Sequence, residues 1–162
     1  MAEETTIELK RAALNHYFQN LNTPQQQAVF HVNGPVLVLA GAGSGKTTAM
    51  IHRIVQMIHF GDGWVQANAS ITKEDAAYLK DYIADKQPAD LERLCSILAV
   101  QPIQPWHILA ITFTNKAAKE MKERAASLTG KAADKMLITT FHSACVKFLK
   151  NRMILLGYKR GN

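Results

Sequence analysis

The sequence has few of the residues that stabilise small secreted domains or anchor a chain in a membrane. Only two of its 162 residues are cysteines, Cys95 and Cys145, and neither has a second thiol or a histidine at metal-ligand spacing. This scarcity excludes a disulfide framework, gives no indication of a zinc site and is typical of a reducing compartment. No apolar run has the length needed to cross a bilayer, and the first ten residues are polar and acidic, unlike a secretion signal. We therefore expect a soluble, cytoplasmic protein with no membrane partner.

Aromatic residues are also scarce, at 7%, but the hydrophobic share of 48% is enough for one domain with a core of its own. Basic residues outnumber acidic ones by 19 to 13, which gives a formal net charge of +6. Such an excess suits a polyanionic partner, either nucleic acid or the phosphates of a nucleotide. Because many basic proteins bind neither, the choice between these classes has to come from motifs.

Three short apolar runs, each followed by a helical pattern, predict the framework of the fold. The runs cover residues 35–40, 108–113 and 136–140, and the helices cover residues 46–60, 115–128 and 142–156. The first run is continuously apolar, as in a strand that is buried on both faces of a parallel sheet. Strands that alternate with helices predict an α/β fold in which helices flank a parallel sheet.

Two helices are predicted ahead of the first apolar run. An amphipathic pattern covers residues 5–19. A shorter helix follows, with Thr23 as its predicted N-cap, Pro24 as its first residue and Gln26 as the partner in a capping box. The apolar face of the first helix needs a partner elsewhere in the chain.

The stretch between the first two strand and helix units differs from the rest of the chain. Residues 61–105 contain helical patterns over residues 74–83, capped by Thr72, and over residues 91–98. We interpret this stretch as a helical hairpin inserted into the α/β framework. The alternatives for its role are modulation of DNA binding or contact with a partner, and we favour a passive elaboration of the surface.

The strongest signal is a glycine-rich loop between the first strand and its helix. The loop comprises Ala40, Gly41, Ala42, Gly43, Ser44, Gly45, Lys46 and Thr47. Glycines let the backbone wrap closely around a polyphosphate, so that successive N–H groups and the start of the helix point at negative charge. In such a loop Lys46 reaches the β- and γ-phosphates and the Thr47 hydroxyl ligates Mg²⁺. The strict pattern has glycine where Ala40 stands, but a methyl group is tolerable there because the position precedes the tight turn.

With the segments on either side of this loop, the chain resembles the UvrD/Rep/PcrA group of superfamily 1 DNA helicases. Residues 21–29 look like the family's Q motif, in which the position that reads adenine falls on Gln25, whose amide offers a donor and an acceptor. Residues 40–47 match motif I, and residues 52–54 continue the match along the same helix. The resemblance implies a partial RecA-like P-loop NTPase domain that uses ATP and Mg²⁺. It also implies that Thr48 and Arg53 belong to the nucleotide site.

Two later segments are similar to the family's DNA-contacting motifs, namely residues 111–118 to motif Ia and residues 139–143 to motif Ib. The residues that the resemblance places on single-stranded DNA are Phe113, Thr114, Asn115, Lys116, Thr140, His142 and Ser143. Their chemistry fits, because an aromatic ring stacks on a base while amide, hydroxyl and ammonium groups hold phosphates. Taken singly these are ordinary core or surface residues, but four motifs in the family's order are specific. They imply binding to single-stranded DNA and to its junctions with duplex.

The sequence departs from the family in two respects. Phosphoryl transfer to water needs an acidic residue for Mg²⁺ and a carboxylate that orients water. The family supplies both as an Asp-Glu pair after an apolar strand beyond motif Ib, and no such pair occurs in these residues. We therefore expect residues 1–162 to be the N-terminal part of helicase domain 1A. In this interpretation they are a monomeric piece of a longer 3′ to 5′ helicase with a role in DNA repair, without ATP hydrolysis of its own. The second departure is the insertion at residues 61–105, where the family has a much shorter link.

Two other classes of protein share a phosphate loop of this kind. A small P-loop phosphotransferase has a similar size, but it needs an acceptor pocket and a basic lid, and it gives no reason for residues 112–116 to follow the second strand. A stand-alone module would bind nucleotide or DNA without catalysis. Turnover assays with and without single-stranded DNA separate the three classes, because a phosphotransferase consumes ATP only with its acceptor.

Overall fold

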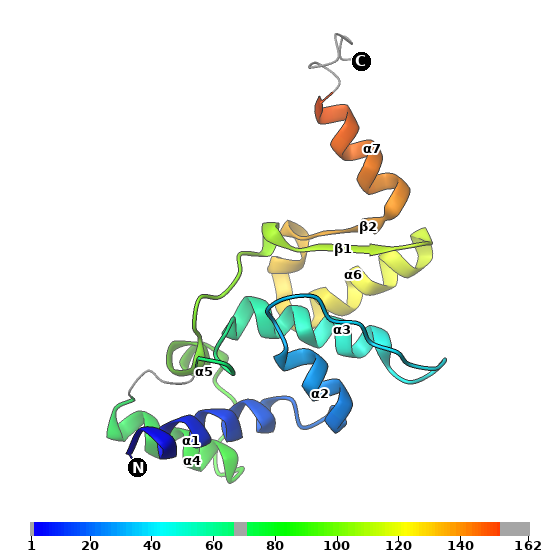
Figure 1. The fold of residues 1–162 in the computed structure, drawn as a ribbon. Helices are drawn as coiled ribbons and strands as arrows, with labels where there is room; N and C mark the ends of the chain where they lie inside the picture. The colour runs from blue at the N-terminus through cyan, green and yellow to red at the C-terminus, as the bar shows by residue number, and fades with distance from the viewer. Residues whose placement is uncertain (1, 67–70, 153–162) are drawn as a thin grey trace. The chain divides into compact units, whose positions relative to one another are not determined.

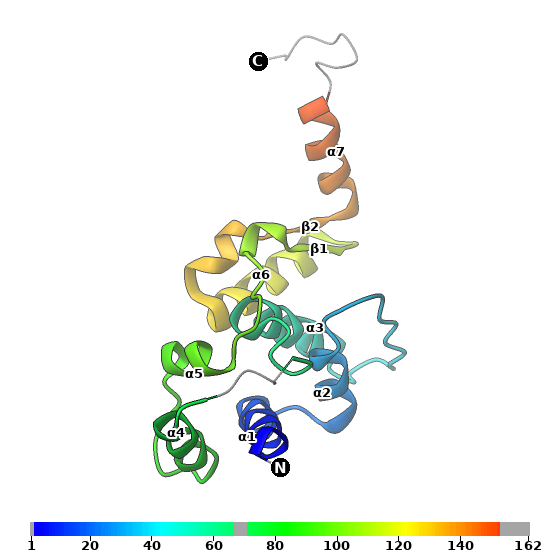
Figure 2. The same ribbon diagram turned by 60° about the vertical axis from the view of Figure 1, so that its left-hand side comes forward.

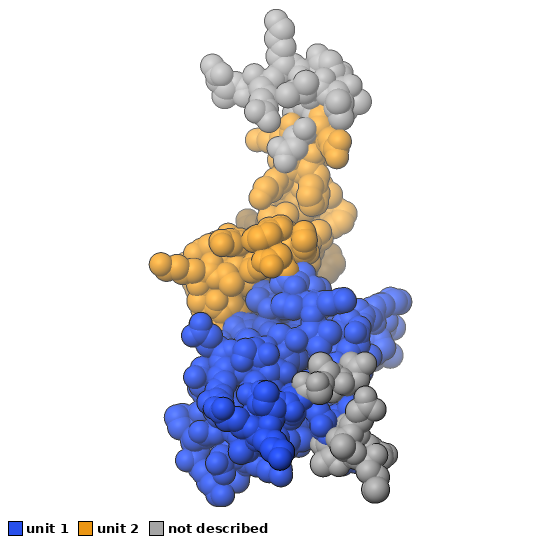
Figure 3. All heavy atoms as spheres, turned by 90° about the vertical axis from the view of Figure 1, so that its left-hand side faces the viewer, with its two compact units in different colours: residues 1–103 blue, residues 104–162 orange. Residues whose placement is uncertain are grey.

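The computed structural model of the protein describes residues 2–66 and 71–152. The chain divides into two units, residues 1–103 and residues 104–162, which Figure 3 shows in different colours. In the described residues, unit 1 is built from helices, and unit 2 contains a two-stranded sheet.

The described part of unit 1 consists of five α-helices and one π-helical turn (Figure 1). They are α1 (Ala2–Tyr17), α2 (Thr23–Phe30), α3 (Lys46–Val55), η1 (Gln56–Phe60), α4 (Lys73–Ile83) and α5 (Leu91–Leu98). The helices expected over residues 5–19, 46–60, 74–83 and 91–98 are confirmed, except that the end of the third is the π-helical turn. Helix α2 packs against α3, and α1 packs against α4 (Figures 1 and 2).

Helix α2 begins at Thr23, one residue earlier than predicted. The Asn22 side chain accepts a hydrogen bond from the Gln25 backbone N–H at 3.0 Å, and the Gln25 side chain accepts one from the Asn22 N–H at 3.1 Å. Asn22 is therefore the N-cap and Gln25 completes the capping box, so the assignment to Thr23 and Gln26 was wrong. The difference has a physical reason, since asparagine caps a helix at least as well as threonine.

One hydrophobic core joins all the helices of unit 1. Its buried members are Ala13, Leu14, Phe18, Leu21, Val29, Phe30, Val55, Phe60, Tyr78, Leu79, Tyr82, Leu94, Ile97 and Leu98. Because α4 and α5 supply six of these residues, the interpretation of residues 61–105 as a passive surface elaboration was wrong. Lys10 of α1 is also buried, and desolvation lowers the pKa of its ammonium group although the carboxylate of Asp75 on α4 acts to raise it.

The strand expected over residues 35–40 does not form. These residues are neither helix nor strand, and the side chains of Leu37 and Leu39 are 83% and 86% exposed. A strand buried on both faces needs neighbouring strands to satisfy its backbone and cover its side chains. The described residues of unit 1 contain only a single bridge, between Gly61 and Val100, which leaves the segment without a strand partner inside the unit.

Unit 2 has the predicted alternation of strands and helices. Its described elements are η2 (Pro105–His107), β1 (Leu109–Thr112), α6 (Asn115–Thr129), η3 (Gly130–Lys135), β2 (Leu137–Thr140) and α7 (Phe141–Arg152). Strands β1 and β2 are parallel, with Leu109 opposite Leu137 and Thr112 opposite Thr140. The expected strands over residues 108–113 and 136–140 are therefore confirmed, in a parallel sheet of two strands.

Helix α6 connects the two strands and packs against both of them. Ala110 and Thr140 of the strands are buried, as are Ala118, Met121 and Ala125 of α6. Helix α7 follows β2 directly, and the end of its predicted range, residues 153–156, lies outside the described residues. None of the helices described is both long enough and apolar enough to span a bilayer.

Candidate functional site

The glycine-rich loop leads directly into α3, whose first residue is Lys46. Gly43 and Gly45 adopt left-handed backbone conformations, with φ of 76° and 79°. The left-handed φ favours glycine at residue 45, and a side chain there would also force the amide end of Gln25 to move. Gly45 is the N-cap of α3 but supplies no side-chain cap, which leaves the first N–H groups of the helix available to an anion.

Lys46 folds back across the loop that precedes it. Its Nζ donates hydrogen bonds to the carbonyl oxygens of Ala40, at 3.0 Å, and Gly41, at 2.6 Å. Both Lys46 and Thr47 are exposed, and Thr48 is partly exposed in the same turn of α3. The ammonium group therefore lies at the mouth of the loop, and the two carbonyl contacts must be exchanged for phosphate contacts if a nucleotide enters.

Gln25 joins α2 to the loop. Its Nε2 donates a hydrogen bond to the Ser44 carbonyl at 3.1 Å, while its Oε1 accepts from Asn22 in the capping box. These contacts use one N–H and one lone pair of the amide group and leave one of each. The amide orientation is therefore determined by the fold, and the remaining donor and acceptor match what an adenine edge requires.

A cavity of about 270 Å³ lies between α2 and the loop. It is lined by Asn22, Pro24, Gln25, Ala28, Val38, Leu39, Ala40, Ser44, Gly45, Lys46 and Ala49. A second cavity of about 340 Å³ shares part of this lining and extends along α3 to Arg53. Arg53 donates a hydrogen bond to the Val32 carbonyl at 3.4 Å, and burial lowers the pKa of its guanidinium group. Of the predicted nucleotide residues, the linings of these two adjoining cavities include Gln25, Ala40, Ser44, Gly45, Lys46 and Arg53, whereas Gly41, Ala42, Gly43, Thr47 and Thr48 do not line them.

The predicted DNA-contacting residues gather in unit 2, where β1 and β2 end side by side. Because Thr112 pairs with Thr140, the segments that follow them lie at the same edge of the sheet (Figure 1). Phe113 is 95% exposed, and the Thr114 hydroxyl caps α6 by accepting a hydrogen bond from the Ala117 N–H at 3.1 Å. Asn115 and Lys116, in the first turn of α6, are exposed as well.

On the neighbouring strand the predicted residues have different environments. Thr140 is only 6% exposed, and its hydroxyl donates to the Ser143 hydroxyl at 2.9 Å and accepts from the Ser143 N–H at 3.3 Å. This threonine therefore shapes the start of α7, whereas His142 and Ser143 are exposed. The sequence reasoning did not select Phe141, which is exposed and meets the His142 ring edge-on. An aromatic residue directly after a strand, as at Phe113, was the signal that could have found it.

The charge of the chain is divided unequally between its two units. Residues 104–162 contain 11 basic and three acidic residues, a net charge of +8, whereas residues 1–103 contain eight basic and ten acidic residues. The positive charge that suits a polyanion is thus concentrated in the unit that carries the exposed aromatic edge. Among the residues that the structure describes, no group of three or more His, Cys, Asp or Glu side chains could hold a metal ion by itself.

The chain is a helix-rich α/β protein. Its glycine-rich loop lies at the start of a helix, and its strand edge is basic and carries exposed aromatic residues. These features define a class of candidate nucleotide- and nucleic-acid-binding proteins. Comparison with known families is more specific. The model of the UvrD/REP helicase N-terminal domain matches residues 21–71 and 91–161. The chain therefore belongs to this family, as the motifs predicted. Residues 72–90, which contain α4, lie between the two matched ranges.

Curated relatives give the same result. The chain is 39% identical to the ATP-dependent DNA helicase PcrA of Bacillus subtilis strain 168 over 146 residues, which cover 90% of this chain and 14% of that protein. It is 37% identical to PcrA of Staphylococcus aureus over 149 residues, or 92% of this chain and 14% of the relative. PcrA of Staphylococcus epidermidis is 36% identical over 147 residues, or 91% and 15%. The chain thus spans about a seventh of the length of these relatives.

Proposed function

We propose that this chain is the ATP-binding segment of an ATP-dependent DNA helicase. In this proposal residues 1–162 are the N-terminal part of the first motor domain, and residues 61–105 are an insertion within it. The whole protein translocates along single-stranded DNA in the 3′ to 5′ direction and unwinds duplex at junctions. The observation that carries the proposal is the loop around Gly45, where an uncapped helix start, Lys46 and the oriented amide of Gln25 converge on one cavity.

The residues present fit ATP with Mg²⁺. The backbone of residues 40–45 and the first N–H groups of α3 bind the phosphates, and the glycine at residue 45 keeps the loop clear of a side chain. Lys46 neutralises phosphate charge, and Thr47 contributes its hydroxyl as a ligand for Mg²⁺. The ion screens the phosphate charge when it is bound. Gln25 reads the adenine edge, and Thr48 and Arg53 complete the wall of the site along α3.

We expect no ATP turnover by this chain alone, because the sequence contains no Asp-Glu pair after an apolar run. The direct test of the proposal is therefore binding. The melting temperature should rise when Mg²⁺ and a non-hydrolysable ATP analogue are added together, since a ligand that binds only the folded state stabilises it. No rise at millimolar nucleotide would contradict the proposal.

The edge formed by Phe113 and the ends of β1 and β2 is proposed as the contact with single-stranded DNA. Phe113 stacks on a base, Asn115 and Lys116 hold phosphates, and His142 and Ser143 approach the backbone from β2. Thr114 and Thr140 hold the starts of α6 and α7, as their hydrogen bonds indicate.

We expect Phe113→Ala to weaken the binding of a fluorescent oligothymidylate about 5- to 150-fold, which corresponds to the loss of one base stacked on an aromatic ring. The measurement is fluorescence anisotropy at low salt, because phosphate contacts dominate the affinity and are screened as salt rises. Phe148→Ala is the matched control, since Phe148 is also exposed but lies on α7 away from the strand ends. Equal affinities for the two variants would show that the aromatic edge is not the DNA contact.

A further inference from the structure

The two ends of the inserted segment lie next to each other. We call this place the neck and define it by Phe60, Gly61, Asp62 and Val100. The Val100 N–H donates to the Phe60 carbonyl at 3.0 Å, and the Asp62 N–H donates to the Val100 carbonyl at 2.7 Å. Gly61 has a φ of 53°, and a side chain there would collide with the Val100 carbonyl. The backbone of residues 60–62 is therefore in direct contact with the backbone of Val100. We call the residues between Asp62 and Val100 the excursion, since the chain departs from the neck and returns to it.

Helix α4, which lies in this excursion, packs against α1, the first helix of unit 1. Leu14 of α1 and Leu79 of α4 are both fully buried in the shared core. At the end of the interface, His16 Nε2 lies 3.1 Å from the Asp85 carboxylate, and the His16 ring meets Tyr82 edge-on at 4.8 Å. The insertion thus supplies the surface on which the N-terminal helix rests.

A second contact attaches α1 to the start of the excursion. Arg11 donates from Nε to the Trp64 carbonyl at 3.2 Å, and its guanidinium group lies 5.5 Å from the centre of the Trp64 ring. The same tryptophan is stacked on Phe30 of α2, with 3.9 Å between ring centres and 4° between planes. Helix α1 is therefore held by contacts from both α4 and the segment next to the neck.

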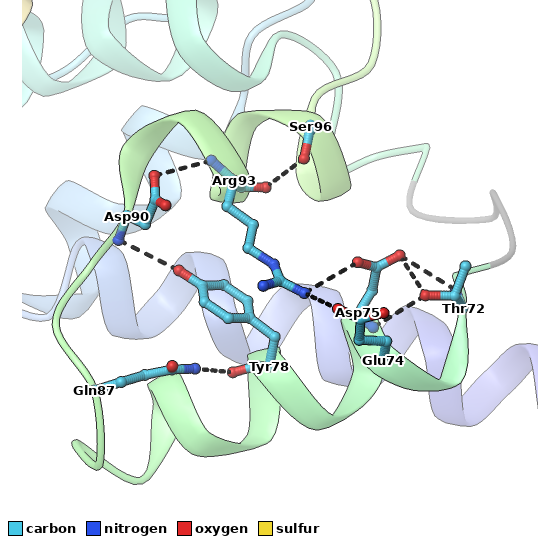
Figure 4. A network of polar contacts seen from close by, with 8 residues as sticks. All are labelled: Thr72, Glu74, Asp75, Tyr78, Gln87, Asp90, Arg93 and Ser96. Atoms are coloured by element: carbon cyan, nitrogen blue, oxygen red, sulfur yellow. Dashed lines mark hydrogen bonds and ion pairs between the residues drawn. The ribbon is translucent and has the colours of Figure 1, made fainter.

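Helices α4 and α5 are joined by polar contacts around Arg93 and Tyr78 (Figure 4). The Arg93 guanidinium lies 4.4 Å from the centre of the Tyr78 ring, 3.2 Å from the Glu74 carboxylate and 3.9 Å from the Asp75 carboxylate. The Tyr78 hydroxyl accepts a hydrogen bond from the Asp90 N–H, the N-cap of α5, at 3.3 Å. Among the described residues, the hydrogen bonds, ion pairs and cation–π contact of Arg93 are with α4, with Asp90 at the N-cap of α5 and with α5 itself.

The neck also contacts the C-terminal end of α3, the helix that begins at Lys46. Helix α3 continues into the π-helical turn η1, where the fully buried Gln56 donates from Nε2 to the Gly61 carbonyl at 3.0 Å. Phe60, the last residue of η1, is fully buried and meets the Tyr17 ring of α1 edge-on at 5.0 Å. The end of α3 is therefore in contact with both α1 and the insertion.

We propose that α1 and the insertion form one cooperative lobe that holds the π-helical turn at the end of the phosphate-loop helix. The lobe consists of α1, α4 and α5, and its parts open and close together. A single 16-residue helix is marginal in water, so α1 depends on the surface that α4 provides. In the same way η1, a turn type that is rare and poorly stable by itself, depends on the contact of Phe60 with Tyr17 of the lobe and on the hydrogen bond from Gln56 to Gly61 in the neck. This inference does not depend on nucleotide binding.

Native-state hydrogen exchange of the full chain without nucleotide tests the lobe, because it reports local opening at each amide. In Arg93→Gln, which removes the ion pairs and the cation–π contact, we expect the amides of α4 and α5 to exchange about three- to tenfold faster. The amides of α1 and η1 should accelerate by a similar factor, although the hydrogen bonds, ion pairs and cation–π contact of Arg93 are with α4, Asp90 and α5. Lys80→Ala is the control, since Lys80 is exposed on the same α4 helix and alanine preserves the helix, and it should leave all rates unchanged.

A second variant separates cooperative opening from a local defect. Leu79→Ala creates a cavity under α1 and should accelerate exchange in α1, α4, α5 and η1 together, by at least about thirtyfold. If either variant accelerated α4 and α5 while the rates of α1 and η1 kept their wild-type values, α1 and η1 would be anchored independently and the proposal would be overturned.

Discussion

Lys46→Ala is expected to abolish the rise in melting temperature that Mg²⁺ and a non-hydrolysable ATP analogue produce. The ammonium group lies at the mouth of the loop on the carbonyls of Ala40 and Gly41, and alanine leaves no cation there to meet the β- and γ-phosphates. Differential scanning fluorimetry with and without nucleotide measures the effect. At a concentration one hundred times the dissociation constant, the wild-type protein should gain about 2.7 kcal/mol, and the variant should gain none.

The variant should fold normally, because Lys46 is exposed and its two contacts are with backbone carbonyls that water can also reach. Lys80→Ala again serves as the control, since it removes one lysine from unit 1 without touching the loop. A nucleotide shift that survived in Lys46→Ala at the wild-type size would show that the nucleotide binds elsewhere.

Gly45→Ala is expected to damage both the nucleotide site and the stability of unit 1. The left-handed φ of 79° costs a residue with a side chain about 1–2 kcal/mol, and the new Cβ would displace the Gln25 amide from the Ser44 carbonyl. We therefore expect the free energy of unfolding, measured in urea, to fall by at least about 1 kcal/mol. The nucleotide-induced shift should disappear as well, because the loop and the Gln25 amide, which we propose reads adenine, lose their common geometry.

Gly41→Ala is the matched control for this substitution within the same loop. A side chain at residue 41 would meet no atom within 4 Å, and Gly41 has no left-handed φ. The two glycine variants should therefore differ clearly in stability. If both kept the wild-type stability, the backbone conformation at Gly45 would not be what shapes the loop.

Local sequence signals predicted much of the fold. The helices over α1, α3, α4, α5 and α6 and the two strands β1 and β2 were expected from periodicity, because an apolar pattern with a fixed period needs only its own residues to be recognised. The loop and the family resemblance also selected Gln25, Ala40, Ser44, Gly45 and Lys46, which are among the residues that line the cavity next to α2. Thr140 shows the limit of such signals, since a motif position can be buried and support a helix start without facing a ligand.

Long-range contacts account for what the sequence reasoning missed. Residues 35–40 have the pattern of a central strand, yet a strand exists only where another backbone pairs with it, and no such partner is found in the described part of unit 1. The inserted helices were recognised as helices, but not as the support of α1. That contact joins residues more than 60 positions apart, and no local pattern records it.

The amino-acid pattern alone was enough to identify the glycine-rich loop, its lysine and the family, because these depend on particular residue types at a fixed spacing. Only the tertiary structure decided that Gln25 is oriented by Asn22 and Ser44 and that the insertion shares a core with α1. It also decided that the aromatic edge of unit 2 is exposed. These features depend on which surfaces meet, and that is settled by packing between distant segments rather than by any single stretch of residues.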